Sequence, residues 1–220
     1  MMLSFTSIFC RLSCMWLILL LGVSMSVAAV FDHPVNADSK RVLTSSLAEM
    51  TRYDVISGDF VQTKSIKKLN RDFVSTGTFR ISKTSGVVWK TEKPFPSELT
   101  VSDEGITERS ANGHVRTIST KDNPVFTEFS KTIQAVFSGN ISDLETKFNV
   151  FYEKTSNGGQ IGLVPREASV RKIVSNIVMD FSSSIDKVVI TDGSGSPVTY
   201  EFKNQKSENE PGSARQAGSP

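Results

Sequence analysis

The feature that most constrains the fold is an alternation of apolar and polar residues with period two, which recurs from Gly58 to Phe202. Such alternation places every second side chain on one face of a sheet, and short runs joined by turns favour a continuous antiparallel sheet. Asn112-Gly113 is a dipeptide typical of a tight hairpin. The predicted strands are 60–64, 73–81, 86–91, 98–102, 106–109, 115–119, 148–152, 160–164, 173–181, 188–190 and 198–202.

Two segments have helical spacing instead. Apolar residues recur every three or four positions over 40–53, with Ser39 as the expected cap, and residues 54–58 should end this helix. A second stripe runs from about Asn123-Pro124 to Gly139-Asn140. Its members are Phe126, Phe129, Ile133, Val136 and Phe137. This second helix interrupts a series of strands. Its apolar stripe should therefore pack on the one large apolar surface that the predicted elements provide, a face of the sheet.

The amino-terminal segment has the pattern of a secretory signal peptide. A single charge precedes an apolar run over 15–23, and small residues follow. Val27 and Ala29 fit the positions −3 and −1, so cleavage is expected before Val30. The apolar run is shorter than the ~20 residues that a bilayer span needs, which argues against a retained anchor.

The predicted signal peptide fixes the first boundary of the predicted domain organisation. Residues 1–29 form the signal peptide, 30–204 form one domain, and 205–220 form a polar, disordered tail. Cys10 and Cys14 both lie in the signal, so the exported chain has no disulfide and its core must hold it together.

No motif for catalysis or metal binding is present. The only histidines, His33 and His114, lack the spacing of metal ligands, and hydrolase and phosphate-loop motifs are missing. Carboxylates such as Asp103-Glu104 are most simply solvated surface groups, and a paired-acid hydrolase is the alternative. A net charge of +2, with both signs interspersed, disfavours a nucleic-acid partner. We therefore expect no enzyme, no cofactor and no metal.

A set of short motifs, in a fixed order, resembles the LolA family of outer-membrane lipoprotein carriers. The resemblance covers about residues 40–204, and the second predicted helix falls where family members carry lid helices. The motifs are Gly58-Asp59-Phe60-Val61-Gln62-Thr63, Ser75-Thr76-Gly77-Thr78-Phe79, Val87-Val88-Trp89, Lys93-Pro94-Phe95 and Glu98-Leu99-Thr100-Val101-Ser102-Asp103-Glu104-Gly105.

This resemblance implies a mainly β (α+β) fold, an open antiparallel β-barrel or half-barrel covered by amphipathic lid helices. It further implies a periplasmic monomer that carries the acyl chains of lipoproteins from an inner-membrane exporter to an outer-membrane acceptor. On this pattern, the hydrophobic cavity and its lid would be formed by Phe60, Phe79, Val87, Trp89, Phe95, Leu99, Val101, Phe126, Phe129, Ile133 and Phe137.

The sequence departs from the family at the lid latch. Family members have an arginine-proline pair ahead of the tryptophan strand, and the arginine holds the lid. Lys83-Thr84 stand at that spacing here, which makes Lys83 the candidate latch, without the forked donors of arginine. Val87 stands where an aromatic residue is common. Two further hypotheses stay open: a carrier of another hydrophobic molecule, such as a glycolipid or aryl polyene, and an envelope-stress sensor module of the same fold.

Overall fold

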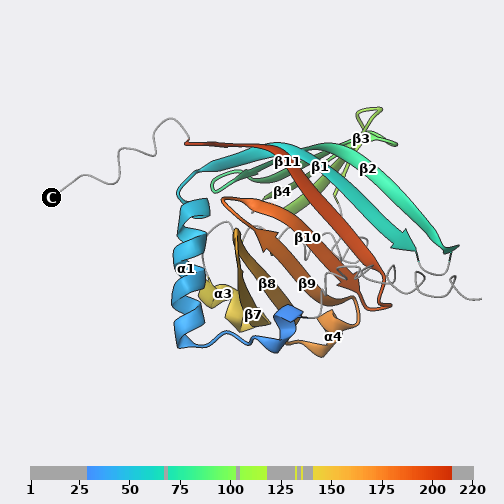
Figure 1. The fold of residues 1–220 in the computed structure, drawn as a ribbon. Helices are drawn as coiled ribbons and strands as arrows, with labels where there is room; N and C mark the ends of the chain where they lie inside the picture. Colours follow the sequence, from blue (N-terminus) through green and yellow to red (C-terminus); the bar gives the residue numbers. More distant parts are fainter. Residues whose placement is uncertain are drawn as a thin grey trace, which may run out of the picture.

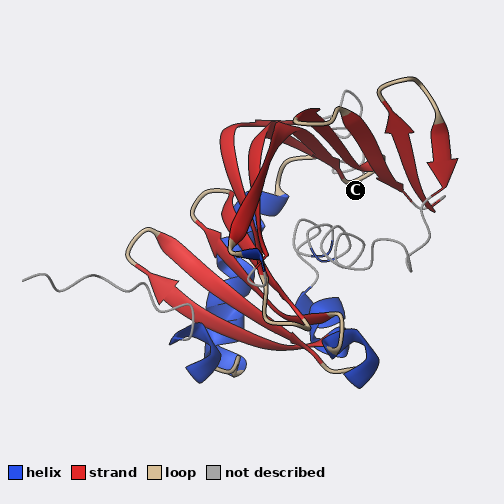
Figure 2. Cartoon of the chain, turned by 90° about the vertical axis from the view of Figure 1, so that its right-hand side faces the viewer, coloured by secondary structure: helices blue, strands red, loops and turns tan. Residues whose placement is uncertain are grey.

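The chain forms a single curved sheet of 11 antiparallel strands within the residues that the structure describes. The computed structural model describes residues 29–66, 69–102, 105–117, 132, 135 and 141–209, apart from the side chains of Glu49 and Met50. The spatial order is β6-β5-β4-β3-β2-β1-β11-β10-β9-β8-β7, so β6 and β7 are the two edges (Figure 1). The edges do not pair with each other, and the sheet curls without closing (Figure 2).

The order of the strands shows two antiparallel meanders joined at the centre, where β1 pairs with β11. The strands are β1 (Val55–Ile66), β2 (Arg71–Ser82), β3 (Gly86–Lys93), β4 (Ser97–Ser102), β5 (Gly105–Ser110), β6 (Val115–Thr117), β7 (Phe148–Thr155), β8 (Gly158–Pro165), β9 (Val174–Phe181), β10 (Ile185–Asp192) and β11 (Pro197–Glu208).

Each predicted strand overlaps one of these, and the predicted fold class is confirmed. Two boundaries differ most from the prediction. β1 begins at Val55, inside the expected break, because its backbone pairs with both β2 and β11 there. β11 continues beyond the predicted domain limit at residue 204, and its Lys206 and Glu208 pair with Ser57 and Val55. Backbone pairing needs no apolar side chain, so a polar segment can extend a strand.

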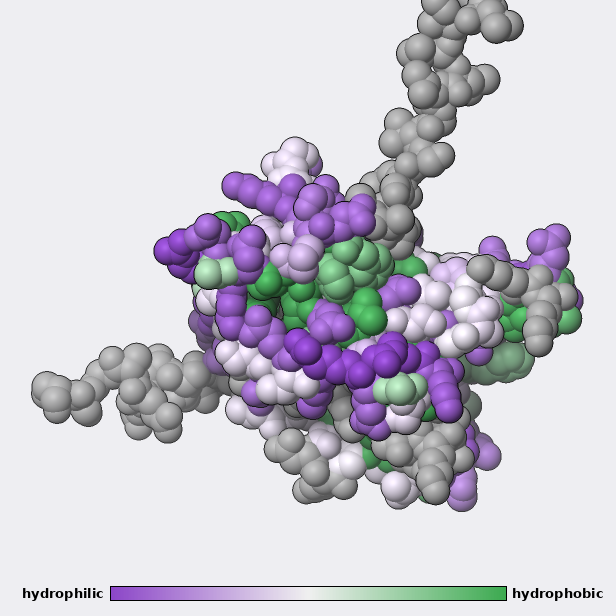
Figure 3. Space-filling view, turned by 90° about the horizontal axis from the view of Figure 1, so that it is seen from below, coloured by the Kyte–Doolittle hydropathy of each residue, from purple (hydrophilic) through white to green (hydrophobic). Residues whose placement is uncertain are grey.

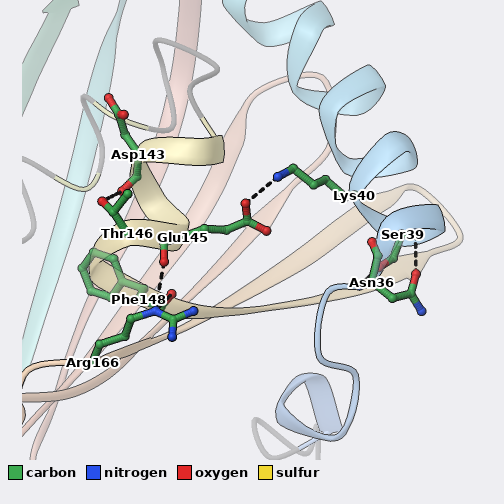
Figure 4. A network of polar contacts seen from close by, with 8 residues as sticks. All are labelled: Asn36, Ser39, Lys40, Asp143, Glu145, Thr146, Phe148 and Arg166. Atoms are coloured by element: carbon green, nitrogen blue, oxygen red, sulfur yellow. Dashed lines mark hydrogen bonds and ion pairs between the residues drawn. The ribbon is translucent and has the colours of Figure 1, made fainter.

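Helix α1 (Ala37–Thr51) corresponds to the first predicted helix, with a different cap. Asn36, not Ser39, is the N-cap: its Oδ1 accepts hydrogen bonds from the backbone N–H groups of Asp38 (3.0 Å) and Ser39 (2.9 Å). The Ser39 hydroxyl oxygen accepts the backbone N–H of Asn36 at 2.9 Å, which completes a capping box (Figure 4). Leu43 and Leu47 form the buried side of the helix.

Three short helical elements were not predicted: η1 (Ala29–Asp32), α3 (Ile141–Lys147) and α4 (Ala168–Arg171). The second predicted helix lies almost entirely outside the described residues, including Phe126, Phe129, Ile133 and Phe137; Thr132 and Ala135, which are described, are both helical. Residues 1–28 of the predicted signal peptide also lie outside. In the part of the chain that is described, no helix has the length and apolarity to cross a membrane.

The two faces of the sheet are covered differently. On the outer face, η1 packs over β8, where a Cβ at Gly162 would lie 3.0 Å from Val30 and 2.9 Å from Phe31. Phe31 meets Phe151 of β7 edge-on, with ring centroids 5.4 Å apart. The main hydrophobic core lies on the opposite face, which we call the inner face and define by Phe60, Trp89, Tyr200, Met179 and Tyr152.

Candidate binding surface on the inner face

The strand register brings the predicted lining residues of the first meander together. Trp89 lies opposite Phe79 on β2 and Leu99 on β4, and Val87 lies opposite Val101. All of these side chains are buried. Residues directly opposite one another in an antiparallel pair share one face, so these side chains form a continuous apolar surface across β2, β3 and β4.

The same surface continues over the second meander, whose residues were not among the predicted lining residues. One row of opposite residues runs from Tyr200 through Val188, Met179 and Ile161 to Tyr152. The alternation that would have identified these residues is present in the sequence, but the family motifs lie in the first half of the chain. The buried members of this half are Phe148, Val150, Tyr152, Ile161, Leu163, Val174, Ile177, Met179, Phe181, Val188, Ile190, Val198, Tyr200 and Phe202.

An aromatic cluster joins the two halves around Trp89. Its ring centroid lies 4.2 Å from that of Phe60, 5.4 Å from Tyr200 and 6.0 Å from both Phe79 and Phe202. The rings of Tyr200 and Phe202 stand at 85° and 88° to the indole, the edge-to-face geometry that aromatic pairs prefer. β1 and β11 are therefore held together by ring packing as well as by backbone hydrogen bonds.

Helices supply the cover of this surface at one end. Leu43 and Leu47 of α1, and Ile141 and Leu144 of α3, belong to the same buried cluster as the inner face. Ala135 also packs against that cluster. Ala135 and α3, which lie between β6 and β7 in the chain, thus contribute to the cover.

A polar clasp fastens α1 to α3 (Figure 4). Lys40 Nζ of α1 lies 2.5 Å from Glu145 Oε2 of α3. Arg166 Nε donates to the main-chain oxygens of Glu145 (2.9 Å) and Phe148 (3.0 Å), and so ties the end of α3 to the start of β7. The clasp holds the two covering helices in place over the inner face.

Lys83 belongs to the turn between β2 and β3, and its side chain lies beside the carboxyl end of α1. Its Nζ donates to the main-chain oxygen of Thr51 and lies 3.8 Å from Asp54 Oδ1, and its backbone N–H donates to the oxygen of Asp54 at 3.0 Å. A cation is favourable at this end of a helix dipole. Lys83 therefore fastens α1 to the β2–β3 turn, and its role as a latch stays a prediction.

Phe95 does not line the inner face, and this prediction was wrong. Its side chain is 81% exposed in the turn between β3 and β4, after the cis Lys93–Pro94 peptide. The turn lies beyond the last paired residues of the two strands, Thr91 and Ser97, and the Phe95 side chain extends from it into solvent.

A profile of the family described as outer membrane lipoprotein carrier protein LolA matches residues 51–215. The chain belongs to the LolA family. No curated protein matches it significantly. The matched segment begins at the end of α1 and includes every strand, so the inner face described above is the inner face of a LolA-family sheet.

Three solved structures of low sequence identity resemble this chain over most of its length. A DUF1329 family protein from Desulfovibrio piger is 9% identical with a TM-score of 0.45, over 77% of this chain and 92% of that one. A LolA superfamily protein from Nitrosomonas europaea is 8% identical with a TM-score of 0.45, over 78% and 94%. The MucA/MucB complex of Pseudomonas aeruginosa is 14% identical with a TM-score of 0.44, over 83% of this chain and 62% of that one.

Two groups of this LolA-family protein have pKa values shifted in opposite directions, Tyr200 on the inner face and Asp192 at the end of β10. Burial raises the pKa of the Tyr200 hydroxyl above its ordinary value of 10.0, so the group stays neutral at physiological pH. The pKa of Asp192, the last residue of β10, is shifted the other way. Burial raises this pKa, but hydrogen bonds from Ser194 and Ser196, together with nearby Lys64, outweigh burial and leave the pKa lowered. Among the described residues, no group of three or more His, Cys, Asp or Glu could hold a metal ion.

Apolar side chains also reach the surface of the protein. Seen from below, hydrophobic residues gather in the middle of the molecule and hydrophilic residues surround them (Figure 3). An apolar area with a polar border is the usual form of a site for an apolar ligand.

Proposed function

We propose that this LolA-family protein is a periplasmic carrier that holds the acyl chains of a lipid-modified protein against its inner face. The observation that supports the proposal is the inner face itself, a continuous apolar surface that both meanders share and that helices cover without closing the sheet. The family to which the chain belongs is described as a lipoprotein carrier. The predicted signal peptide fits a site of action in the periplasm.

The energetics fit reversible binding. Burial of an acyl chain gains ~0.8 kcal/mol per methylene, so a chain of about 16 carbons gains roughly 12 kcal/mol before costs. Association and ordering remove ~4–15 kcal/mol of that gain. The small surplus suits a protein that receives cargo from an inner-membrane exporter and surrenders it to an outer-membrane acceptor without a chemical step.

Trp89 provides a direct test. The chain has two tryptophans, Trp16 in the predicted signal peptide and Trp89 on the inner face, so the processed protein has a single fluorescent indole. A palmitoyl chain brominated at its midpoint should quench Trp89 emission saturably, because bromine quenches only on close approach. The absence of saturable quenching would contradict the proposal.

A matched variant locates the ligand. In Trp89→Phe/Phe95→Trp, the indole moves to a position that is 81% exposed in the native protein. The same lipid should leave this indole unquenched, and equal quenching at both positions would indicate binding outside the inner face. Native mass spectrometry of protein taken from its own periplasm identifies the cargo: a lipopeptide supports a lipoprotein carrier, and a free glycolipid or polyene contradicts it.

A further inference from the structure

One polar group on the inner face, the hydroxyl of Tyr152, would find no hydrogen-bond partner in a plain hydrocarbon chain. Tyr152 of β7 is 6% exposed, and its hydroxyl is buried without a hydrogen-bond partner in the described part of the chain. Thr132 is 3% exposed, and its hydroxyl is also buried without a hydrogen-bond partner among the described residues. A buried hydroxyl without a partner costs stability, and native proteins rarely leave one so.

The surroundings hold the Tyr152 ring in position. It stacks on Phe181, with centroids 6.4 Å apart and planes 22° apart, and lies opposite Ile161. A Cβ at Gly159 would lie 2.7 Å from Cε2 of the ring, so glycine there leaves the space that the ring fills. The backbone N–H of Tyr152 donates to the oxygen of His33 at 3.0 Å, which fixes the strand as well. The hydroxyl is therefore preorganised among apolar groups.

We propose that the Tyr152 hydroxyl donates a hydrogen bond to the carbonyl oxygen of the linkage that joins an acyl chain to its cargo. The inference rests on the proposed function and makes it more specific. A hydroxyl embedded in apolar side chains needs a ligand that is apolar along its length and carries an acceptor, and an acyl ester or amide has this composition. Phenylalanine would fill the same space against Phe181 without burying a donor.

The test compares two lipids that differ only in the carbonyl group: 1-palmitoylglycerol, an ester, and 1-O-hexadecylglycerol, its ether analogue. The dissociation constant of each is measured by calorimetry with the wild-type protein and with Tyr152→Phe. The wild-type protein should bind the ester about three- to tenfold more tightly, the range that one hydrogen bond supplies. Tyr152→Phe should lose this preference while its affinity for the ether is unchanged.

Two controls separate recognition from structure. Tyr152→Phe should unfold at the same or a higher urea concentration than the wild type, because no hydrogen bond of the free protein is lost; a lower midpoint would overturn the inference. Tyr53→Phe, which alters a tyrosine outside the buried cluster of the inner face, should keep the preference for the ester. If the wild type binds both lipids equally, only the proposed role of Tyr152 is refuted. If the wild type binds neither lipid, the proposed function is refuted as well.

Discussion

Replacement of Lys83 by methionine tests how the carboxyl end of α1 is held. Methionine keeps an unbranched apolar stem but removes the ammonium group that donates to the Thr51 oxygen and faces Asp54. A hydrogen bond of this kind contributes ~0.5–1.5 kcal/mol, and a cation at a helix carboxyl end adds ~0.3–1 kcal/mol. The 3.8 Å ion pair adds little, because the Lys83 side chain is 33% exposed. We expect the free energy of unfolding to fall by about 1–2 kcal/mol.

Urea unfolding at fixed ionic strength measures this loss, and amide hydrogen exchange shows where it arises. The last turn of α1 should exchange faster in Lys83→Met, while the strands near Trp89 should exchange as in the wild type. Lys90→Met on β3 is the matched control, because Lys90 is exposed on the sheet. Its unfolding free energy should change by less than about 0.5 kcal/mol. An equal loss in both variants would refute the argument.

The same substitution probes cargo release. Leu43 and Leu47 of α1 belong to the cover of the inner face, so a looser α1 should open more often. Because about 1.4 kcal/mol corresponds to a factor of ten, Lys83→Met should raise the dissociation rate of a bound palmitoyl lipid by up to about tenfold, with a smaller effect on association. Stopped-flow quenching of Trp89 measures both rates. An unchanged dissociation rate would show that α1 does not control release.

Four other substitutions test the packing of the sheet. Phe60→Ala should lower the free energy of unfolding by about 3–5 kcal/mol in urea, whereas Phe95→Ala, at a site 81% exposed, should change it by less than about 0.5 kcal/mol. Gly77→Ala should cost about 1–3 kcal/mol in the same assay, since the new Cβ would lie 1.9 Å from the oxygen of Lys90. Burial raises the pKa of Tyr200, so its contribution is complete below about pH 10 and is lost as the pH rises further; Tyr200→Phe should flatten the alkaline loss of stability.

Much of the fold could be predicted from local patterns. Period-two alternation located each strand, including the pair around Asn112-Gly113, and helical spacing located α1. The cap at Asn36 was missed although its signal was present, an asparagine followed three residues later by a serine that completes a capping box. These features depend on residues that are neighbours along the chain, so the sequence alone carries them.

The composition of the inner face was decided by tertiary structure. Tyr152 and Phe60 lie on one surface because β1 pairs with β11 and the strands from β11 to β7 continue in register. Lys83 meets the end of α1 because the β2–β3 turn packs against residues 51–54, a contact that no local pattern contains. Alternation shows which residues share a face of their own strand. Which strands become neighbours, and which side chains then share one surface, depends on hydrogen bonds between segments far apart in the chain, and only the folded sheet contains them.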